Sequence, residues 1–159
     1  MKIKTETLKD TKKLAKIFAE CLDKNGLFVT LTGDIGAGKT QFVRYVLEYL
    51  NVSEKVTSPS FVILNEYKSP LCPIYHFDLY RLEQKGLSSM IDELREYSKI
   101  GKLTFIEWAE FGLNEIPDVA LNINVEYDDE NLDIRYFTFS SQNKDNDVFL
   151  DKLIKRINK

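Results

Sequence analysis

The sequence has few cysteines, no excess of positive charge and no long apolar run, and each shortage excludes a class of protein. Cys21 and Cys72 show no metal-ligand spacing, and two cysteines do not make a disulfide framework. No apolar run is long enough to span a bilayer, and the first residues lack the hydrophobic region of a signal peptide. We therefore expect a protein of the reducing cytoplasm without a membrane association.

The charge balance also gives no indication of a nucleic-acid surface. The chain has 22 Lys and Arg against 25 Asp and Glu, a net charge of −3. Any link to RNA would have to be local or pass through a partner. The 159 residues contain no internal repeat, low-complexity tract or linker, so we expect a single domain over residues 1–159 with room for a proper core.

What the sequence does contain is a glycine-rich loop between an apolar strand and a helix. Residues 27–32 are typical of a buried strand, and apolar residues follow the loop at helical spacing from Phe42 to Leu50. This is the context that a phosphate-binding loop requires. The pattern of a glycine, any four residues and then Gly-Lys-Thr is met by Gly33, Asp34, Ile35, Gly36, Ala37, Gly38, Lys39 and Thr40.

The residue types in this loop suit a nucleoside triphosphate with Mg²⁺. Glycines let the backbone turn sharply and point N–H groups at phosphate oxygens, and the following helix adds the positive end of its dipole. Lys39 would reach the β- and γ-phosphates, and the Thr40 hydroxyl would take one Mg²⁺ position. The alternative is a glycine-rich turn that binds no ligand.

Hydrolysis also needs carboxylates, and two acidic residues are expected at strand ends. Glu107 ends an apolar strand and is the better candidate for the metal. Asp78 lies at the end of another strand and is the second candidate. The alternative for each is an ordinary hydrogen-bonded or solvated acid.

Periodicity and turn residues place these motifs in an α/β fold. Thr7 and Asp10 form a capping-box pattern at the start of a helix, and Gly26 is placed to end that helix. We predict a three-layer P-loop NTPase-like sheet with mixed parallel and antiparallel strands and helices on both faces. Besides 27–32, strands are predicted over 61–67, 74–80, 103–108, 119–127 and 132–139, and further helices within 82–99 and over 147–159.

Other classes of phosphate-loop protein are tested by their missing motifs. A GTPase would carry Asn-Lys-x-Asp, whereas residues 143–146 read Asn-Lys-Asp-Asn. The chain is too short for a transporter ATPase and carries no signature of that class. A small-molecule or nucleoside kinase stays open, although it would want an arginine-rich lid and the middle segment offers only Arg81 and Arg95.

Four motifs follow one another along the chain. They are the Gly33–Thr40 loop, Thr57-Ser58-Pro59-Ser60-Phe61, Tyr75-His76-Phe77-Asp78-Leu79-Tyr80-Arg81-Leu82 and Ile106-Glu107-Trp108. The loop itself is shared by many proteins, but the later motifs are far more specific. In this order the four motifs resemble those of the TsaE family, the bacterial P-loop ATPases of tRNA threonylcarbamoyladenosine synthesis.

The resemblance implies a role for each matching residue. Lys39 would hold the phosphates of ATP, with Thr40 and Glu107 on Mg²⁺. Asp78 would be the acid needed for hydrolysis, either ordering the water or supporting the metal. The family is understood to act on a complex of the proteins TsaD and TsaB, and to meet tRNA only through that complex. A nucleotide-dependent interaction module with negligible turnover is a third reading beside the ATPase and the kinase.

The remaining motif residues have two readings each. Thr57 and Ser58 lie in a loop that resembles a nucleotide-sensing switch, and Trp108 would either stabilise loop closure or lie at the edge of the core. Strand alternation places His76 and Tyr80 on the face of Asp78, where we favour a supporting role for His76 over a catalytic one. Arg81 would either stabilise phosphate charge or pair with a surface acid.

Overall fold

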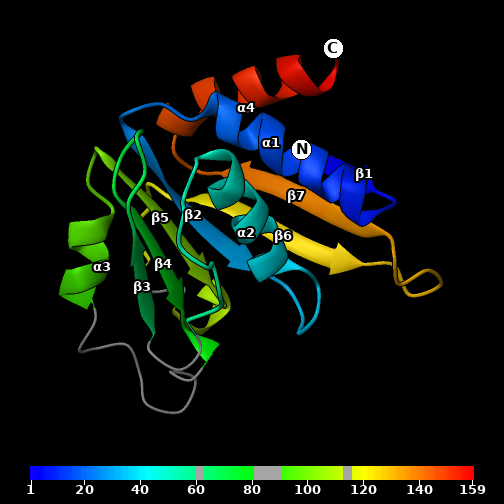
Figure 1. Cartoon of the computed structure of the whole chain (residues 1–159), viewed down its shortest axis with the longest axis horizontal. Coiled ribbons are helices and arrows are strands. Elements are labelled where there is room, and N and C mark those ends of the chain that lie inside the picture. Colours follow the sequence, from blue (N-terminus) through cyan, green and yellow to red (C-terminus); the bar gives the residue numbers. More distant parts are fainter. Residues whose placement is uncertain (60–62, 81–90, 113–115) are drawn as a thin grey trace.

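The chain folds around one mixed seven-stranded sheet. A computed structural model describes residues 1–59, 63–80, 91–112 and 116–159 (Figure 1). The strands lie in the order β1-β7-β6-β2-β5-β4-β3. Their bounds are β1 Lys2–Thr5, β2 Gly26–Thr32, β3 Leu64–Tyr67, β4 Ile74–Asp78, β5 Lys102–Glu107, β6 Leu121–Tyr127 and β7 Arg135–Ser141. The helices are α1 Leu8–Cys21, α2 Lys39–Tyr49, α3 Ile91–Tyr97 and α4 Asp145–Ile157, with a short 3₁₀ turn, η2, at Ala109–Gly112.

The centre of the sheet is parallel and its flanks are antiparallel. β2 pairs in parallel with both β5 and β6, and β4 pairs in parallel with β5. β1, β7 and β3 each run antiparallel to a neighbour. Because the carboxyl ends of parallel strands meet at one edge, the loops that follow β2, β4 and β5 come together there. The predicted mixed sheet is confirmed.

Helices cover both faces of the sheet, as predicted. α1, α2 and α4 share one face, and α1 runs between the other two (Figure 1). The fully buried ring of Phe18 joins them, with its centroid 5.5 Å from that of Phe42 on α2 and 5.0 Å from that of Phe149 on α4. On the other face a smaller core forms where Leu94 of α3 packs with Phe77 and other apolar residues. Within the described part of the chain, no helix is long and apolar enough to cross a membrane.

The first helix begins as predicted but does not end at Gly26. The Thr7 hydroxyl accepts from the Asp10 amide at 3.2 Å, and the Asp10 carboxylate accepts from the Thr7 amide at 3.0 Å, which is a complete capping box. The helix then ends at Cys21, and Gly26 is instead the first residue of β2, with φ of 71°. A Cβ at Gly26 would lie 1.9 Å from the carbonyl oxygen of Lys102. This glycine is therefore required by the close approach of β5, not by a helix end.

One strand was missed and two strand predictions need correction. β1 was not predicted, because its four residues carry no apolar run and it forms only as an edge strand on β7. The strand predicted over 74–80 ends at Asp78, because the Asp78 carboxylate accepts from the Tyr80 amide at 3.0 Å and turns the chain. The strand predicted over 132–139 begins only at Arg135, after a turn in which Asp128 accepts two backbone amides.

Other predicted elements differ mainly at their ends. β3 covers the second half of the strand predicted over 61–67, whose first two residues lie outside the described part. α3 covers only part of the helix predicted within 82–99, and 82–90 likewise lie outside it. The last helix runs from Asp145 to Ile157, against a prediction of 147–159.

The role of Gly26 can be tested against a matched glycine. Gly26 and Gly101 both have a positive φ, but a Cβ at Gly101 would meet open space. We expect Gly101→Ala to lower the free energy of unfolding by about 1–2 kcal/mol through backbone strain alone. Gly26→Ala should cost a further ~1–3 kcal/mol, because β5 must move away. Equal losses in urea-induced unfolding of the two variants would show that the contact with Lys102 is unimportant.

Candidate nucleotide-binding site

The glycine loop lies between the end of β2 and the start of α2 and is held open by left-handed backbone. Gly33, Gly36 and Gly38 have φ of 121°, 76° and 109°. A Cβ at Gly33 would lie 2.0 Å from the carbonyl oxygen of Val125, whereas one at Gly36 would meet nothing within 4 Å. Gly38 is the N-cap of α2, and no side chain among the described residues caps that helix end. The loop therefore presents backbone to a ligand, with the positive end of α2 behind it.

Lys39 is almost fully buried at the base of this loop. Its ammonium donates to the carbonyl oxygens of Gly33 and of Asp34, the latter at 2.9 Å, and lies 3.7 Å from the ring centroid of Trp108. Burial lowers the pKa of Lys39 below its ordinary value, and the charges of Glu107 and Glu110 oppose that effect. Among the residues that the structure describes, the lysine is thus held by carbonyl dipoles and an aromatic face, and it forms no direct ion pair.

A hydrogen-bonded chain links the loop to two strands. The Thr40 hydroxyl donates to Glu107 Oε2 at 2.7 Å, and His76 Nε2 lies 2.7 Å from Glu107 Oε1. When Glu107 is ionised its carboxylate can only accept, and His76 Nε2 is then the donor of this hydrogen bond. His76 and Glu107 are both buried, and His76 Nδ1 has no hydrogen-bond partner in the part of the chain that the structure describes. Glu107 is therefore fixed from both sides.

Asp78 lies beside Glu107 and is tied to a loop. The two residues are direct neighbours in the β4–β5 register. The Ser58 hydroxyl donates to Asp78 Oδ2 at 2.5 Å, and the Tyr80 amide donates to Asp78 Oδ1. Thr57 is exposed next to Ser58, and its carbonyl accepts from a side-chain amide at 3.1 Å. The acid is thus connected to the segment that resembles a switch.

The aromatic residues of the motifs gather at the same place. Trp108 adopts a left-handed φ of 59°, which turns its indole over Lys39 directly after β5. The ring of Tyr80 lies 4.9 Å from that of Trp108, and Phe111 stacks on the indole with centroids 5.6 Å apart and lies 6.3 Å from Tyr80. Arg81 lies outside the described residues, so its two readings both stay predictions.

These side chains line a cleft of about 520 Å³. Its floor carries the cation, the hydroxyl and the acids described above, and its rim is formed by the loop and by the exposed face of α2. The lining residues are Ile35, Gly36, Gly38, Lys39, Thr40, Gln41, Arg44, Ser58, Asp78, Tyr80, Glu107 and Trp108. The structure thus brings together most residues that the motifs single out, from four separate segments.

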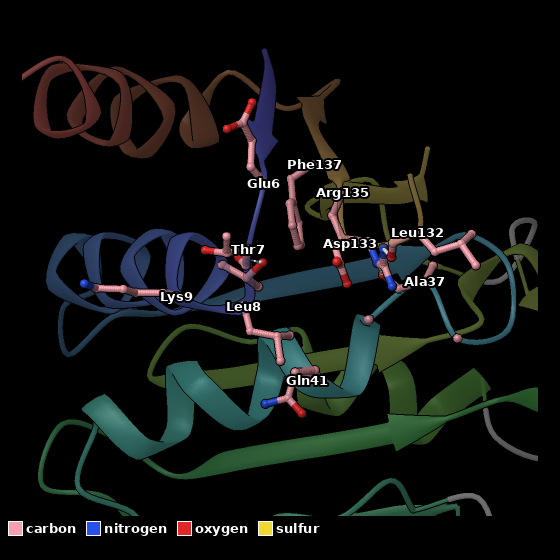
Figure 2. Close-up of a pocket in the computed structure, with 13 residues that line it drawn as sticks. Glu6, Thr7, Leu8, Lys9, Ala37, Gln41, Leu132, Asp133, Arg135 and Phe137 are labelled. Carbon is pink, nitrogen blue, oxygen red and sulfur yellow. Dashed lines mark hydrogen bonds between the residues drawn. The ribbon is translucent and has the colours of Figure 1, made fainter. Parts of the chain in front are cut away.

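A second hollow, of about 630 Å³, lies on the other side of the same loop (Figure 2). Gly36, Ala37 and Gly38 line it together with the start of α1 and the turn before β7. Leu8 and Leu132 border it, and about two thirds of the surface of each residue is exposed. This hollow, which we call the α1-side hollow, was not predicted, because it is assembled from three distant segments that carry no shared motif.

Arg135 connects the α1-side hollow to the loop. Its Nε donates to the carbonyl oxygen of Ala37 at 2.8 Å (Figure 2), and its Nη1 donates to the carbonyl oxygens of Leu132 and Ile134. The guanidinium therefore fixes the phosphate loop to β7. In the sequence Arg135 is only one residue of a predicted strand, and its position gives no signal of this contact.

Glu110 is a second residue that the motifs did not single out. It lies in η2, and its Oε2 is buried without a hydrogen-bond partner among the described residues. Burial lowers the pKa of Lys39, and the charge of Glu110 opposes that lowering. The only sequence signal was its position three residues after Glu107, which by itself indicates no function.

The chain was compared with known protein families, curated proteins and solved structures. The family model described as "Threonylcarbamoyl adenosine biosynthesis protein TsaE" matches residues 5–136. A protein of Bacillus subtilis named tRNA threonylcarbamoyladenosine biosynthesis protein TsaE is 32% identical over 160 residues, covering 99% of this chain and 96% of the relative. A protein of the same name from Rickettsia bellii is 38% identical over 122 residues, covering 76% of this chain and 83% of the relative.

A solved structure agrees with these matches. The crystal structure of YdiB from Bacillus subtilis has a TM-score of 0.79 and 30% sequence identity, and the likeness covers 99% of this chain and 96% of that one. The specific motifs that accompany the phosphate loop lie within the matched residues. Because the family model covers most of the chain and relatives align along nearly all of it, this protein is a member of the TsaE family.

Proposed function

We propose that this chain binds Mg-ATP in the Gly33–Thr40 loop and hydrolyses it slowly, as one component of the machinery that makes threonylcarbamoyladenosine in tRNA. The observation that carries the proposal is the 2.7 Å hydrogen bond from Thr40 to Glu107, directly behind a loop whose glycines leave the backbone open. Family membership supports the pathway, because the relatives are named for this biosynthesis.

The loop residues fit a triphosphate. Open space at the Cβ positions of Gly36 and the uncapped start of α2 give phosphate oxygens access to backbone N–H groups. Lys39 already points its ammonium at the loop, where it donates to two carbonyl oxygens. A phosphate would be a stronger acceptor for this cation than a neutral carbonyl.

Thr40 and Glu107 fit Mg²⁺, which takes hard oxygen ligands and keeps several of its waters. A hydroxyl and a carboxylate held 2.7 Å apart present two such oxygens at one place. His76 would hold Glu107 in that orientation through Oε1. Mg²⁺ supplies charge neutralisation on the phosphates when it is bound.

Asp78 would orient the water that attacks the terminal phosphate. It lies next to Glu107 on the neighbouring strand and lines the cleft. Ser58 holds one of its oxygens, so any movement of the Thr57–Ser58 segment also moves the acid. This connection supports a switch in which loop position and hydrolysis are coupled.

The α1-side hollow would take the nucleoside. It adjoins the loop on the face opposite the cleft, so a nucleotide whose phosphates follow the loop can reach it. Leu8 and Leu132 offer apolar contacts to a planar base, and Arg135 lies close enough to hold the loop at the same time. This arrangement supports a whole nucleotide as ligand and not an isolated phosphate.

The partners are proposed from the family. The chain would act as a single domain of residues 1–159 on a complex of the proteins TsaD and TsaB, and would meet tRNA only through that complex. The alternative function, a small-molecule kinase, differs in that phosphate is transferred to an acceptor molecule.

Lys39→Ala tests the phosphate site. Removal of the ammonium should weaken ATP binding by about ten- to a hundredfold, because a charge-assisted contact is lost. Isothermal titration calorimetry measures the affinity, and Lys24→Ala, an exposed lysine before β2, is the matched control that should bind normally. Loss of ATP binding without loss of tRNA modification in a reconstituted system would contradict the proposed function.

Asp78→Asn tests the hydrolytic acid. We expect hydrolysis to fall by about 10²–10⁴-fold, while ATP affinity changes little, because the acid acts on the water and not on the phosphates. Phosphate release measures the rate, and Asp151→Asn on the exposed side of α4 is the control. Unchanged hydrolysis and unchanged tRNA modification would show that the role given to Asp78 is wrong.

Partner binding separates the ATPase from the kinase. TsaD and TsaB should be retained on the immobilised chain in an ATP-dependent way and should raise its hydrolysis rate. A pull-down with and without ATP measures the first effect. An absence of nucleotide-dependent association, together with phosphate transfer to a small acceptor, would favour the kinase.

A further inference from the structure

Arg44 lies on α2 one helical turn after Thr40 and lines the cleft. Long side chains on a helix point back toward its N-terminus, over the residues three and four positions earlier. The guanidinium is therefore directed toward the turn that carries Thr40, on the exposed surface of α2. Lys39 and Arg44 are the two cations among the described lining residues of this cleft.

The guanidinium of Arg44 is held only weakly. Its one hydrogen bond among the described residues runs from Nη1 to Gln41 Oε1 at 3.5 Å, which is long for such a bond. The structure shows no ion pair between Arg44 and any described carboxylate. Two other arginines are engaged at short distances, Arg156 by Glu20 at 2.7 Å and Arg135 by the Ala37 carbonyl at 2.8 Å. Arg44 thus keeps nearly all of its donors for another acceptor.

The charges of the cleft show which acceptor is missing. Asp78 and Glu107 lie on its floor, where each already accepts hydrogen bonds from the protein. Lys39 is committed to the inner side of the loop, beside Trp108. At the outer end, past Thr40, the guanidinium of Arg44 has no counter-charge within the part of the chain that the structure describes. A planar guanidinium binds phosphate through two parallel hydrogen bonds, so this end suits a phosphoryl group.

We propose that Arg44 binds the terminal phosphate of ATP and thereby lets the cleft distinguish ATP from ADP. This inference rests on the proposed function and adds to it the residue that reads the nucleotide state. The loop amides would contact phosphates that both nucleotides carry, and Lys39 would reach the β- and γ-phosphates. Arg44, at the outer end of the cleft, would contact the terminal phosphate alone.

The test compares two nucleotides on three variants. Affinities for ADP and for a non-hydrolysable ATP analogue with a β,γ-imido bridge are measured by calorimetry in the presence of Mg²⁺. Arg44→Ala should lower the affinity for the ATP analogue by about ten- to a hundredfold, since one charge-assisted contact is lost. The affinity for ADP should change by less than about twofold. Arg44→Lys, which keeps the charge but not the planar fork, should recover part of the discrimination.

Arg156→Ala on α4 is the matched control, because it removes an exposed arginine that lies outside the cleft. It should bind both nucleotides as the unchanged chain does. Equal weakening of ADP and of the ATP analogue by Arg44→Ala, or no change in either, would overturn the inference while the proposed function stands. If the unchanged chain bound neither nucleotide, both would fail.

Discussion

The hydrogen bond between Thr40 and Glu107 is the contact on which the arrangement of the site depends. It joins the first turn of α2 to the end of β5 across 2.7 Å. It forms only because β2 and β5 are parallel neighbours, with Leu31 directly opposite Glu107. The loop that follows β2 therefore begins beside the strand end that carries the acid. On the next strand, the register places Asp78 opposite Glu107 as well.

This contact belongs to a cluster of buried polar side chains, and burying them would cost folding free energy if they had no partners inside the protein. Lys39, His76, Asp78 and Glu107 are each at most 4% exposed. A buried charge or polar atom that lacks a partner costs of order 1–3 kcal/mol or more. The chain offsets this by pairing His76 with Glu107, Ser58 with Asp78, and Lys39 with loop carbonyls and the Trp108 ring. Such a site costs stability but holds its side chains in fixed positions, as a ligand-binding site requires.

The phosphate loop separates two hollows, and this division gives the loop two neighbours. On one side lie the acids and the aromatic residues of the motifs. On the other side Arg135 ties the Ala37 carbonyl to β7. A nucleotide bound as we propose would contact both sides, so it would bridge the antiparallel flank of the sheet and the β4–β5 centre. The switch-like segment at Ser58 is attached to the β4–β5 part of the sheet through its hydrogen bond to Asp78.

Sequence alone determined the local parts of this protein. The Gly33–Thr40 loop, the capping box at Thr7 and the apolar strand that carries Glu107 at its end follow from residue types at short spacing, because backbone conformation and hydrogen bonding there are set by near neighbours. The strand predicted over 74–80 ends earlier, at Asp78. The sequence pattern predicted Gly26 as a helix end, and this was wrong. The carbonyl of Lys102, which leaves no room for a Cβ at position 26, belongs to a strand far along the chain that only the sheet register brings close. Only the tertiary structure decided that Arg135 reaches Ala37 and that Arg44 lines the cleft. Contacts between distant segments depend on sheet order and register, which no local pattern encodes.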